Sequence, residues 1–319
     1  MKKAIATVLV CLMALTLLAA CGGNGTEQAS PSPGNSGAGG NNGAGEASPG
    51  NSGAGGNEDP PPANNFDTDR VIAVFTREDG SGTRDAFVNI TGVGDDMYIE
   101  AVVQNETAQI LTSVETNETG IGYVSVGSLS SNVKALTIDG VMPSNDTVFD
   151  GSYSLQRPFL VVVTDEKKSD PLVQDFIDFM LSADGQALSA TRWTQAVSAP
   201  AAYEASGLTG VLKVGGSTSV EPLMQPLREA YIALNPGVEI EISGGGSGVG
   251  INESTEGLLD IGMSSRNLRD NEKEALTDIT IALDGVAVIV NAANPLAGLS
   301  LEQVKDIFTG EITRWNQIG

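Results

Sequence analysis

Short apolar runs alternate with helix-like segments from Arg70 to the end of the chain. The strand-like runs, rich in β-branched residues, cover residues 71–75, 211–214, 238–242 and 258–263. Helical patterns begin at Arg84 and at Val220, the second extending to Leu234, and a third covers residues 172–188. This alternation predicts an α/β protein whose mixed sheets are flanked by helices.

The N-terminus has the pattern of a secretion signal. Lys2 and Lys3 precede an apolar run over residues 4–18, which is too short to span a membrane comfortably. The run leads through Ala19 and Ala20 to Cys21, a sequence that resembles a bacterial lipobox. We expect a signal peptide at residues 1–20 and a lipid on Cys21, the alternative being an ordinary cleaved signal with an incidental cysteine.

Beyond the signal, the longest apolar run covers residues 281–290 and is interrupted by Asp284 and Gly285. It falls short of the roughly 18 residues of a membrane span. We therefore expect a soluble body that is held at the outer face of the cytoplasmic membrane by its lipid alone.

A segment without core-forming residues separates the cysteine from the predicted body. Residues 22–65 consist mainly of Gly, Asn, Ser, Ala and Pro, and SPGNSGAGGN occurs at both 32–41 and 48–57. Such a segment has little to bury and is expected to stay disordered. We interpret residues 21–66 as the lipidated cysteine and a linker that holds the body roughly 35 Å from the membrane.

Charge and composition exclude several function classes. The chain carries 17 Lys and Arg against 40 Asp and Glu, a formal charge of −23, which argues against nucleic-acid binding. It has no His, so Ser-His and Cys-His nucleophile pairs are absent, as is the commonest metal ligand. Of two cysteines, Cys11 lies in the predicted signal, so no internal disulfide is expected, and no metal or cofactor is predicted.

Small hydroxyl residues and glycines follow four predicted strands. The segments are Thr76-Arg77-Glu78-Asp79-Gly80-Ser81-Gly82-Thr83, Gly215-Gly216-Ser217-Thr218-Ser219, residues 243–250 with Ser247, and Ser264-Ser265-Arg266. Helix N-termini present free N–H groups and a partial positive charge, and Ser and Thr add donors. Several such ends together can hold a small oxyanion, with Arg77 as a bidentate partner.

Each of these segments also has a simpler interpretation. A single Ser or Thr at such a position is typical of a helix N-cap. Arg77 and Asp79 could form only a surface ion pair. Residues 246–250 lack the GxGxxG spacing, and no Gly-Lys-Ser/Thr follows, so nucleotide binding is disfavoured.

Taken together, the segments resemble the PstS-type phosphate-binding lipoproteins of ABC transporters. The similarity extends over nearly all of residues 70–319 and includes VLKVGGSTSVEPLMQPLREAY, VEIEISGGGSGVGI, GLLDIGMSSRNLRDNEKEAL, FTREDGSGTRDAF and YSLQRPFLVVVT. The resemblance implies a type II periplasmic-binding-protein fold, in which two α/β lobes enclose the anion. It further implies a monomer that is no enzyme, captures inorganic phosphate and delivers it to the permease subunits.

The resemblance assigns roles to individual residues. The ligand-binding set it implies is Arg77, Ser81, Gly82, Thr83, Thr218, Ser219, Ser247 and Ser265. Asp79 matches the carboxylate that orients the arginine, and Ser264 is a supporting residue. Ser265 stands where well-known members carry an Asp that accepts a proton from phosphate. We therefore expect weaker selection against sulfate, unless Glu241 or Asp284 takes that role.

The segments occur in a different order from that of the family. Residues 67–155 resemble the family's second lobe, and residues 156–319 resemble its first lobe. This order indicates a circular permutation, with a truncated tandem protein or a dimer with exchanged halves as the alternatives. Under permutation one hinge crossing, near Gln156-Arg157-Pro158, would remain, and the hinge would be less stiff.

Other functions compete with phosphate transport. The pocket could bind another oxyanion, or serve phosphate sensing or a surface scaffold without transport. A phosphoester hydrolase with Ser81 or Ser219 as nucleophile is disfavoured because the chain has no His and no metal-ligand cluster. Trp193, Trp315 and Phe308 are interpreted as packing residues.

Overall fold

The computed structural model describes residues 65–318. The predicted signal peptide, Cys21 and the linker up to residue 64 lie outside the described residues. Within the described range, no helix combines the length and apolarity that a membrane span requires.

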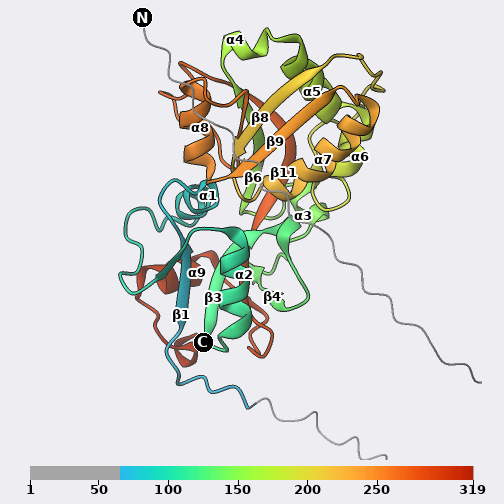
Figure 1. Cartoon of the computed structure of the whole chain (residues 1–319). Coiled ribbons are helices and arrows are strands. Elements are labelled where there is room, and N and C mark those ends of the chain that lie inside the picture. Colours follow the sequence, from blue (N-terminus) through green and yellow to red (C-terminus); the bar gives the residue numbers. More distant parts are fainter. Residues whose placement is uncertain (1–64, 319) are drawn as a thin grey trace, which may run out of the picture. The chain divides into compact units, whose positions relative to one another are not determined.

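Strands and helices alternate along the described chain, as the apolar pattern predicts (Figure 1). The first half contains β1 (Ala73–Arg77), α1 (Gly82–Thr91), β2 (Val102–Gln104), α2 (Thr107–Thr116), β3 (Gly120–Ser125), η1 (Val126–Ser128), β4 (Val133–Ala135), β5 (Thr137–Ile138), α3 (Asn145–Phe149), β6 (Gln156–Val163), α4 (Asp165–Lys168), α5 (Pro171–Leu181), α6 (Ala183–Ser189) and β7 (Thr194–Gln195). The second half contains β8 (Gly210–Gly216), α7 (Glu221–Leu234), β9 (Val238–Gly244), α8 (Ser247–Thr255), β10 (Ile261–Ser264), β11 (Thr277–Asn291), β12 (Gly298–Leu299), α9 (Leu301–Thr309) and η2 (Trp315–Gln317).

One long strand joins the strands of both halves into a mixed sheet. The strand order is β2-β1-β3-β11-β6-β10-β8-β9. The first part of β11 pairs antiparallel with β6, and its last part pairs antiparallel with β3. We call residues 65–155 and 285–318 lobe A, and residues 156–284 lobe B.

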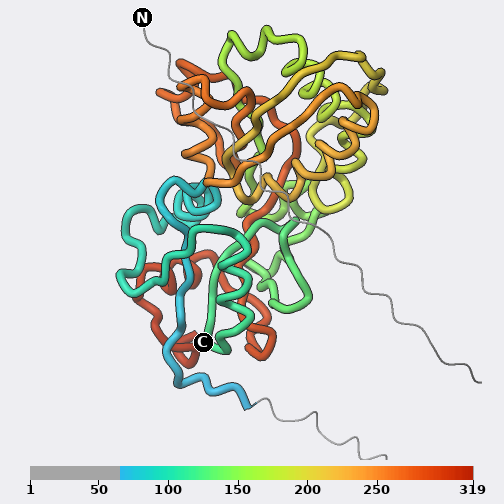
Figure 2. The backbone as a smooth tube through the Cα atoms, in the orientation of Figure 1, coloured from blue at the N-terminus to red at the C-terminus, as the bar shows by residue number. Residues whose placement is uncertain are grey.

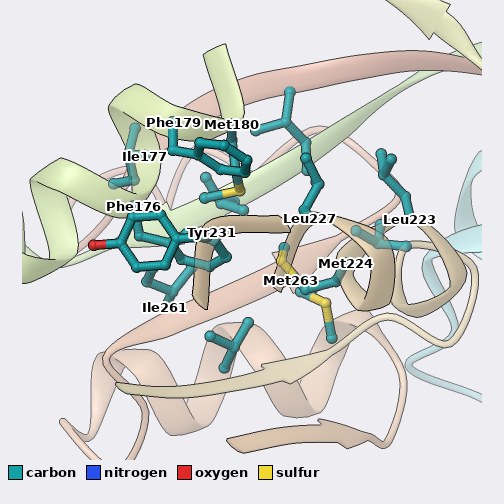
Figure 3. Packing of buried hydrophobic residues seen from close by; sticks show 14 of the residues in the cluster. Phe176, Ile177, Phe179, Met180, Leu223, Met224, Leu227, Tyr231, Ile261 and Met263 are labelled. Atoms are coloured by element: carbon teal, nitrogen blue, oxygen red, sulfur yellow. The ribbon is translucent and has the colours of Figure 1, made fainter. Parts of the chain in front are cut away.

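Each lobe has its own buried core. In lobe A the core brings Phe87, Tyr123 and Val288 together with Phe308 and Trp315. In lobe B, α5 and α7 bury Phe176, Met180 and Tyr231 against the sheet (Figure 3). Trp193 and Trp315 are 2% and 5% exposed, so both are packing residues as predicted.

The membership of the lobes differs from the sequence interpretation. Residues 285–318 were assigned to the same lobe as residues 156–284, but Val286, Val304 and Phe308 pack in the core of lobe A. The chain therefore crosses between the lobes twice, on the neighbouring strands β6 and β11 (Figure 2). The prediction of a single remaining crossing and a weaker hinge is wrong, because β11 carries the second crossing within one unbroken strand.

The helix predicted over residues 172–188 is also interrupted. Ser182 adopts an extended conformation, ends α5, and accepts a hydrogen bond from Gly185 N–H at the start of α6. A Cβ at Gly185 would lie 2.2 Å from the carbonyl oxygen of Phe179. The turn between α5 and α6 therefore needs a glycine at this position.

The two ends of the described chain lie side by side in lobe A. Val71 and Arg314 form an antiparallel bridge, and Ile72 N–H donates to the Thr313 carbonyl. The ring of Phe66 packs edge-on against Trp315. The segment that joins the two halves, residues 196–209, is fastened to lobe B where Tyr203 and Ser206 donate to Asp175.

Candidate functional site

Helix N-termini from both lobes meet at one place between the lobes. Lobe A contributes the start of α1, capped by Ser81, and the start of α2 at Thr107. Lobe B contributes the loop before α7 and the start of α8 at Ser247. A backbone hydrogen bond from Gly248 N–H to the Gly80 carbonyl ties α8 to the loop before α1. The first-turn amides of a helix have no intrahelical partner and can bind an anion. Two of them already have acceptors here, because Gly248 N–H donates to the Gly80 carbonyl and Arg84 N–H to Ser81 Oγ.

Hydroxyl groups from the two lobes contact one another at this place. The Thr83 and Ser219 hydroxyl oxygens are 2.7 Å apart, although the residues are far apart in the sequence. The Thr107 hydroxyl lies 3.2 Å from that of Ser219. Thr83 and Ser219 are both almost fully buried, at 2% and 1% exposure, so this cluster is shielded from solvent.

Gly82 lies against the opposite lobe without room for a side chain. A Cβ at Gly82 would lie 2.1 Å from Ser247 Oγ and 2.8 Å from Ser265 Oγ. Ser247 Oγ in turn accepts a hydrogen bond from Ser265 N–H at 3.0 Å. The close approach of the lobes therefore depends on glycine at this position.

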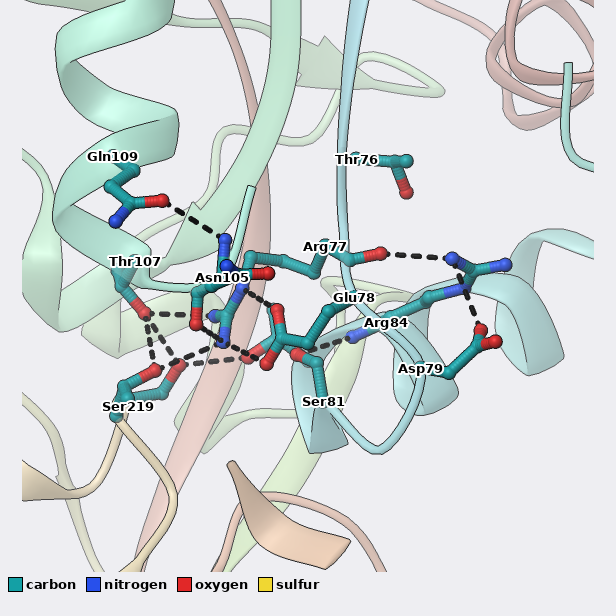
Figure 4. Close-up of polar contacts among 12 residues, drawn as sticks. Thr76, Arg77, Glu78, Asp79, Ser81, Arg84, Asn105, Thr107, Gln109 and Ser219 are labelled. Carbon is teal, nitrogen blue, oxygen red and sulfur yellow. Dashed lines mark hydrogen bonds and ion pairs between the residues drawn. The ribbon is translucent and has the colours of Figure 1, made fainter. Parts of the chain in front are cut away.

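Arg77 is the charged member of the cluster (Figure 4). Its side chain is 2% exposed, and Nε and Nη2 each donate to Glu78 at 2.8 Å. Nη1 donates to Thr107 Oγ1 and Nη2 to Thr218 Oγ1 of lobe B, at 3.2 and 3.1 Å. Arg77 thus lies across the gap between the lobes, with its charge balanced by Glu78.

The role assigned to Asp79 is wrong. Asp79 is exposed and lies 3.3 Å from Arg84, while Glu78 holds Arg77. The two neighbouring carboxylates therefore have different arginine partners, Glu78 with Arg77 and Asp79 with Arg84. The carboxylate that fixes the arginine is therefore one residue earlier than the motif suggested.

Ser81 and Ser264 support local structure. Ser81 Oγ caps α1 by accepting from Arg84 N–H at 3.3 Å. Ser264 Oγ donates to the Arg266 carbonyl and accepts from Arg266 N–H, which shapes the loop after β10. These contacts hold Gly82 and Ser265 in position.

Neither Glu241 nor Asp284 provides, next to Ser265, the carboxylate that well-known PstS-type members carry there. Ser265 Oγ accepts a hydrogen bond from Ser217 Oγ at 2.9 Å and lies 3.4 Å from Ser247 Oγ, so its own proton can be donated to Ser247 or to a bound anion. Asp284 is buried against Arg157, Ser125 and Gly127. Glu241 is exposed on β9. Neither acid contacts Ser265, so the arrangement favours donation to an oxyanion over acceptance of its proton.

Sequence reasoning missed several participants. Glu78 and Thr107 bind Arg77, Ser217 donates to Ser265, and Arg266 binds Asp85 across the lobes at 2.8 Å. Ser217 and Glu78 lie inside the glycine- and hydroxyl-rich segments that follow the predicted strands, so the sequence indicated their neighbourhood but not their roles. Thr107 follows a weak, three-residue strand, and only the pairing of β1 with β2 brings it to the site.

A larger cavity lies beside the cluster. It has a volume of about 740 Å³ and is lined by Glu78 and Thr107 from lobe A and by Thr218, Glu221 and Arg192 from lobe B. No group of His, Cys, Asp and Glu suited to a metal occurs among residues 65–318.

Comparison with known proteins assigns the chain to a family. A PBP superfamily domain matches residues 63–184 and 196–319. "Phosphate-binding protein PstS 2" of Streptococcus pneumoniae is 45% identical over 256 residues, which cover 77% of this chain and 87% of that protein. The chain belongs to the PstS family. Its fold is the periplasmic-binding-protein fold expected from the sequence resemblance.

A solved PstS-family structure matches across most of the described chain. The crystal structure of a phosphate ABC transporter, phosphate-binding protein from Streptococcus pneumoniae TIGR4 is 44% identical and superimposes with a TM-score of 0.66, covering 78% of this chain and all of that one. "Phosphate-binding protein PstS" of Bacillus subtilis is 33% identical over only 114 residues, 35% of this chain and 38% of that protein. The extent of the match therefore differs among PstS relatives.

Proposed function

We propose that this protein captures inorganic phosphate between lobes A and B, outside the cytoplasmic membrane, and passes it to an ABC permease. The observation that carries the proposal is the 2.7 Å contact between Thr83 of lobe A and Ser219 of lobe B, beside Arg77 and Thr218. The names of its PstS-family relatives support phosphate as the ligand.

In the proposed mechanism, lobe closure completes the binding site. The ligand residues are Arg77, Ser81, Gly82, Thr83, Thr218, Ser219, Ser247 and Ser265. Arg77, Arg157 and Arg266 are each paired with a carboxylate, so helix dipoles, amide N–H groups and hydroxyls provide much of the attraction. Because contacts come from both lobes, bound phosphate favours the closed state.

Phosphate titration by calorimetry tests the proposal. The body from residue 67 onward is expected to bind one phosphate, and Thr83→Val is expected to weaken binding at least tenfold because it removes a buried donor. Thr112→Val is the matched control, since Thr112 is exposed on α2 of the same lobe. Equal phosphate affinity in both variants would remove Thr83 from the site, and no binding by the wild-type protein would end the proposal.

A catalytic role is the competing reading. Ser81 and Ser219 would be the nucleophiles, but Ser81 Oγ is used as a helix cap, and Ser219 Oγ contacts only the hydroxyls of Thr83 and Thr107. Neither contact supplies a general base. We therefore propose a binding protein without catalysis, and turnover of a chromogenic phosphate ester that Ser219→Ala abolishes would contradict this.

Circular permutation is the proposed origin of the chain order. The bridge between Val71 and Arg314 supports it, because a short connection there could replace the link through residues 200–209. The partial match to the Bacillus subtilis relative agrees with it, and the match over 87% of the Streptococcus pneumoniae relative runs in the order of this chain, so those two proteins would share the permuted order. A chain reordered as residues 210–318 followed by 67–199 is expected to fold and bind phosphate with similar affinity, and failure to fold would count against permutation.

We further propose a lipid-anchored monomer. Cys21 would carry the lipid, and the segment before Phe66, which packs on Trp315 of the body, would be the tether. Because Thr83 and Ser219 of one chain meet, a complete site does not require exchange of halves between chains. Mass spectrometry of Cys21 in membranes and the solution mass of the phosphate-bound body test these points; an unmodified cysteine or a dimer would contradict them.

A further inference from the structure

A buried ion pair lies where the chain crosses between the lobes. Arg157 on β6 and Asp284 on β11 are register partners in the sheet. Their side chains are 2% and 0% exposed, and Arg157 Nε and Nη2 lie 3.0 and 2.9 Å from Asp284 Oδ2. The pair is thus fixed at the hinge by two strands at once.

The remaining polar atoms of the pair extend in opposite directions. Asp284 Oδ1 accepts from Ser125 Oγ at 2.8 Å and from Gly127 N–H at 3.5 Å, both in lobe A. Arg157 Nη1 donates to the Ser265 carbonyl at 3.2 Å, in the candidate phosphate loop of lobe B. A continuous chain of hydrogen bonds therefore runs from lobe A through the hinge to Ser265.

Folding stability gives little reason to keep such a pair. Removing two charges from water is unfavourable, and well-packed apolar residues often replace a buried ion pair without loss of stability. Burial raises the pKa of Asp284 and lowers that of Arg157, so desolvation works against both charged forms. The forked guanidinium is, however, well suited to fix two acceptors in a set geometry.

We propose that Arg157 is a positioning residue for phosphate binding, which holds the Ser265 loop against the hinge and, through Asp284, couples that loop to lobe A. This rests on the proposed function of the site. In the absence of Arg157, the Ser265 carbonyl would lose its link to the hinge, and Ser265 would be held by the contacts within lobe B, those of Ser217, Ser247 and Ser264. Lobe closure would then align Ser265 less well with Arg77 and Thr83.

Trp193 provides a signal for this coupling. Its ring N–H donates to Ser125 Oγ at 3.3 Å, and Ser125 binds Asp284. Its ring is 2% exposed, and a Cβ at Gly127 would lie 2.0 Å from its Nε1. Movement of Ser125 or Gly127 on phosphate binding should therefore change the fluorescence of Trp193.

The test compares phosphate affinity, thermal stability and fluorescence in a Trp315→Phe background. Arg157→Met combined with Asp284→Leu removes the pair without leaving a lone buried charge. We expect this double variant to unfold at about the wild-type temperature, to bind phosphate at least tenfold more weakly and to lose the phosphate-dependent change of Trp193 emission. Lys167→Met with Asp260→Leu, which removes a partly exposed pair of lobe B, is the control and should keep phosphate affinity.

Arg157→Lys keeps the positive charge but loses the forked guanidinium that binds two acceptors at once. This variant keeps the proposal testable if the double variant fails to fold. We expect its phosphate affinity to stay at least fivefold below wild type, whereas wild-type affinity in either Arg157 variant would overturn the positioning role. The same titration separates the two proposals. A wild-type protein that binds no phosphate ends both, and tight binding by wild type and double variant alike ends only this one.

Discussion

At the scale of single residues, the site combines a compensated charge with neutral donors. Arg77 Nη2 donates both to Thr218 of the opposite lobe and to Glu78, which also accepts from Nε. The hydroxyls of Thr107 and Thr218 accept hydrogen bonds from Arg77, and those of Thr83 and Ser219 lie beside Thr107, all without adding charge. In a chain of formal charge −23, such short-range donors are effective because screening limits the distant field to about 10 Å.

Replacing Arg77 should weaken phosphate binding more than the deletion of any single hydroxyl. Arg77→Ala removes a charge-assisted donor and leaves Glu78 unpaired next to the anion, so we expect a loss of about 2 kcal/mol or more, roughly 30-fold in affinity. Calorimetric titration with phosphate measures it. Arg70→Ala, which removes an exposed arginine of lobe A, is the control. Unchanged affinity in Arg77→Ala would exclude Arg77 from the site.

Ser265 should determine how well the protein distinguishes phosphate from sulfate. A carboxylate repels fully ionised sulfate and accepts a proton from phosphate, whereas Ser265 receives its hydrogen bond from Ser217 and has a proton to donate. We expect sulfate to compete measurably in the wild type and much less in Ser265→Asp. If phosphate affinity in the wild type is undiminished by a large excess of sulfate, this expectation is wrong.

At the scale of elements, α1 of lobe A is latched to the loop after β10 of lobe B. Asp85 on α1 lies 2.8 Å from Arg266 Nε and 2.9 Å from Arg269 Nη2. Glu272 holds the other side of Arg266 with both oxygens, at 2.7 and 2.8 Å. The latch joins the same elements that carry Gly82 and Ser265, so it favours the closed arrangement.

Breaking the latch should weaken phosphate binding without touching the ligand. Partly exposed ion pairs contribute about 1 kcal/mol, so Asp85→Asn should reduce affinity about fivefold, mainly through faster dissociation. Stopped-flow dissociation at low and high salt measures the effect, which should shrink as salt rises in the wild type. Asp146→Asn, on the exposed side of α3, serves as control. A dissociation rate equal to that of wild type would show that the latch does not hold the closed state.

The free energy of unfolding at acid pH should depend on Glu272. Burial raises its pKa, but Arg266 and Arg269 outweigh burial, and the net pKa lies below the ordinary 4.5. A lowered carboxyl pKa stabilises the fold above the unfolded-state value, and that stability is lost as pH falls through the folded-state value. Urea unfolding should therefore show a difference between wild type and Glu272→Gln that is full at pH 7 and shrinks below about pH 4.5. A difference that is constant with pH would contradict the assignment.

The sequence predicts the positions of helices and strands best where Gly, Ser or Pro marks their ends. The strand predicted at 238–242 is β9 (Val238–Gly244), and the helix predicted at 220–234 is α7 (Glu221–Leu234), because Gly, Ser and Pro mark their ends. The loops that bring Thr218, Ser247 and Arg77 together were predicted for the same reason. The sequence does not predict that residues 285–318 belong to lobe A, because an apolar run such as β11 does not indicate where one pairing strand replaces another. Nor could the sequence tell which of two adjacent carboxylates, Glu78 or Asp79, would bind Arg77, because adjacent side chains can have different partners in space.

At the scale of the whole molecule, the lobes are joined by the sheet as well as by the site. The strand β11 pairs with β3 of lobe A and β6 of lobe B, and the Arg157–Asp284 pair lies at that transition. The lobes should therefore unfold as one unit.

Thermal unfolding with and without phosphate tests this unity. We expect one transition that phosphate shifts upward, by about 2.7 kcal/mol at a hundredfold excess over Kd, or roughly 5 to 10 °C for a protein of this size. Scanning calorimetry of the body measures it. Two transitions, of which only one responds to phosphate, would show that the lobes are energetically independent.

The shared strand also limits how the molecule can be divided. A cut between the lobes would have to pass through β11, whose residues 277–285 pair with β6 and β7 of lobe B and whose residues 286–291 pair with β3 and β4 of lobe A. Each lobe would keep its own strand pairs, but lobe A would consist of two separate segments, residues 65–155 and 285–318. The hydroxyl contacts between Thr83 and Ser219 would be divided between the two fragments. Neither lobe is therefore a severable module, and biosensors or domain chimeras made from this protein should exchange the pair of lobes together.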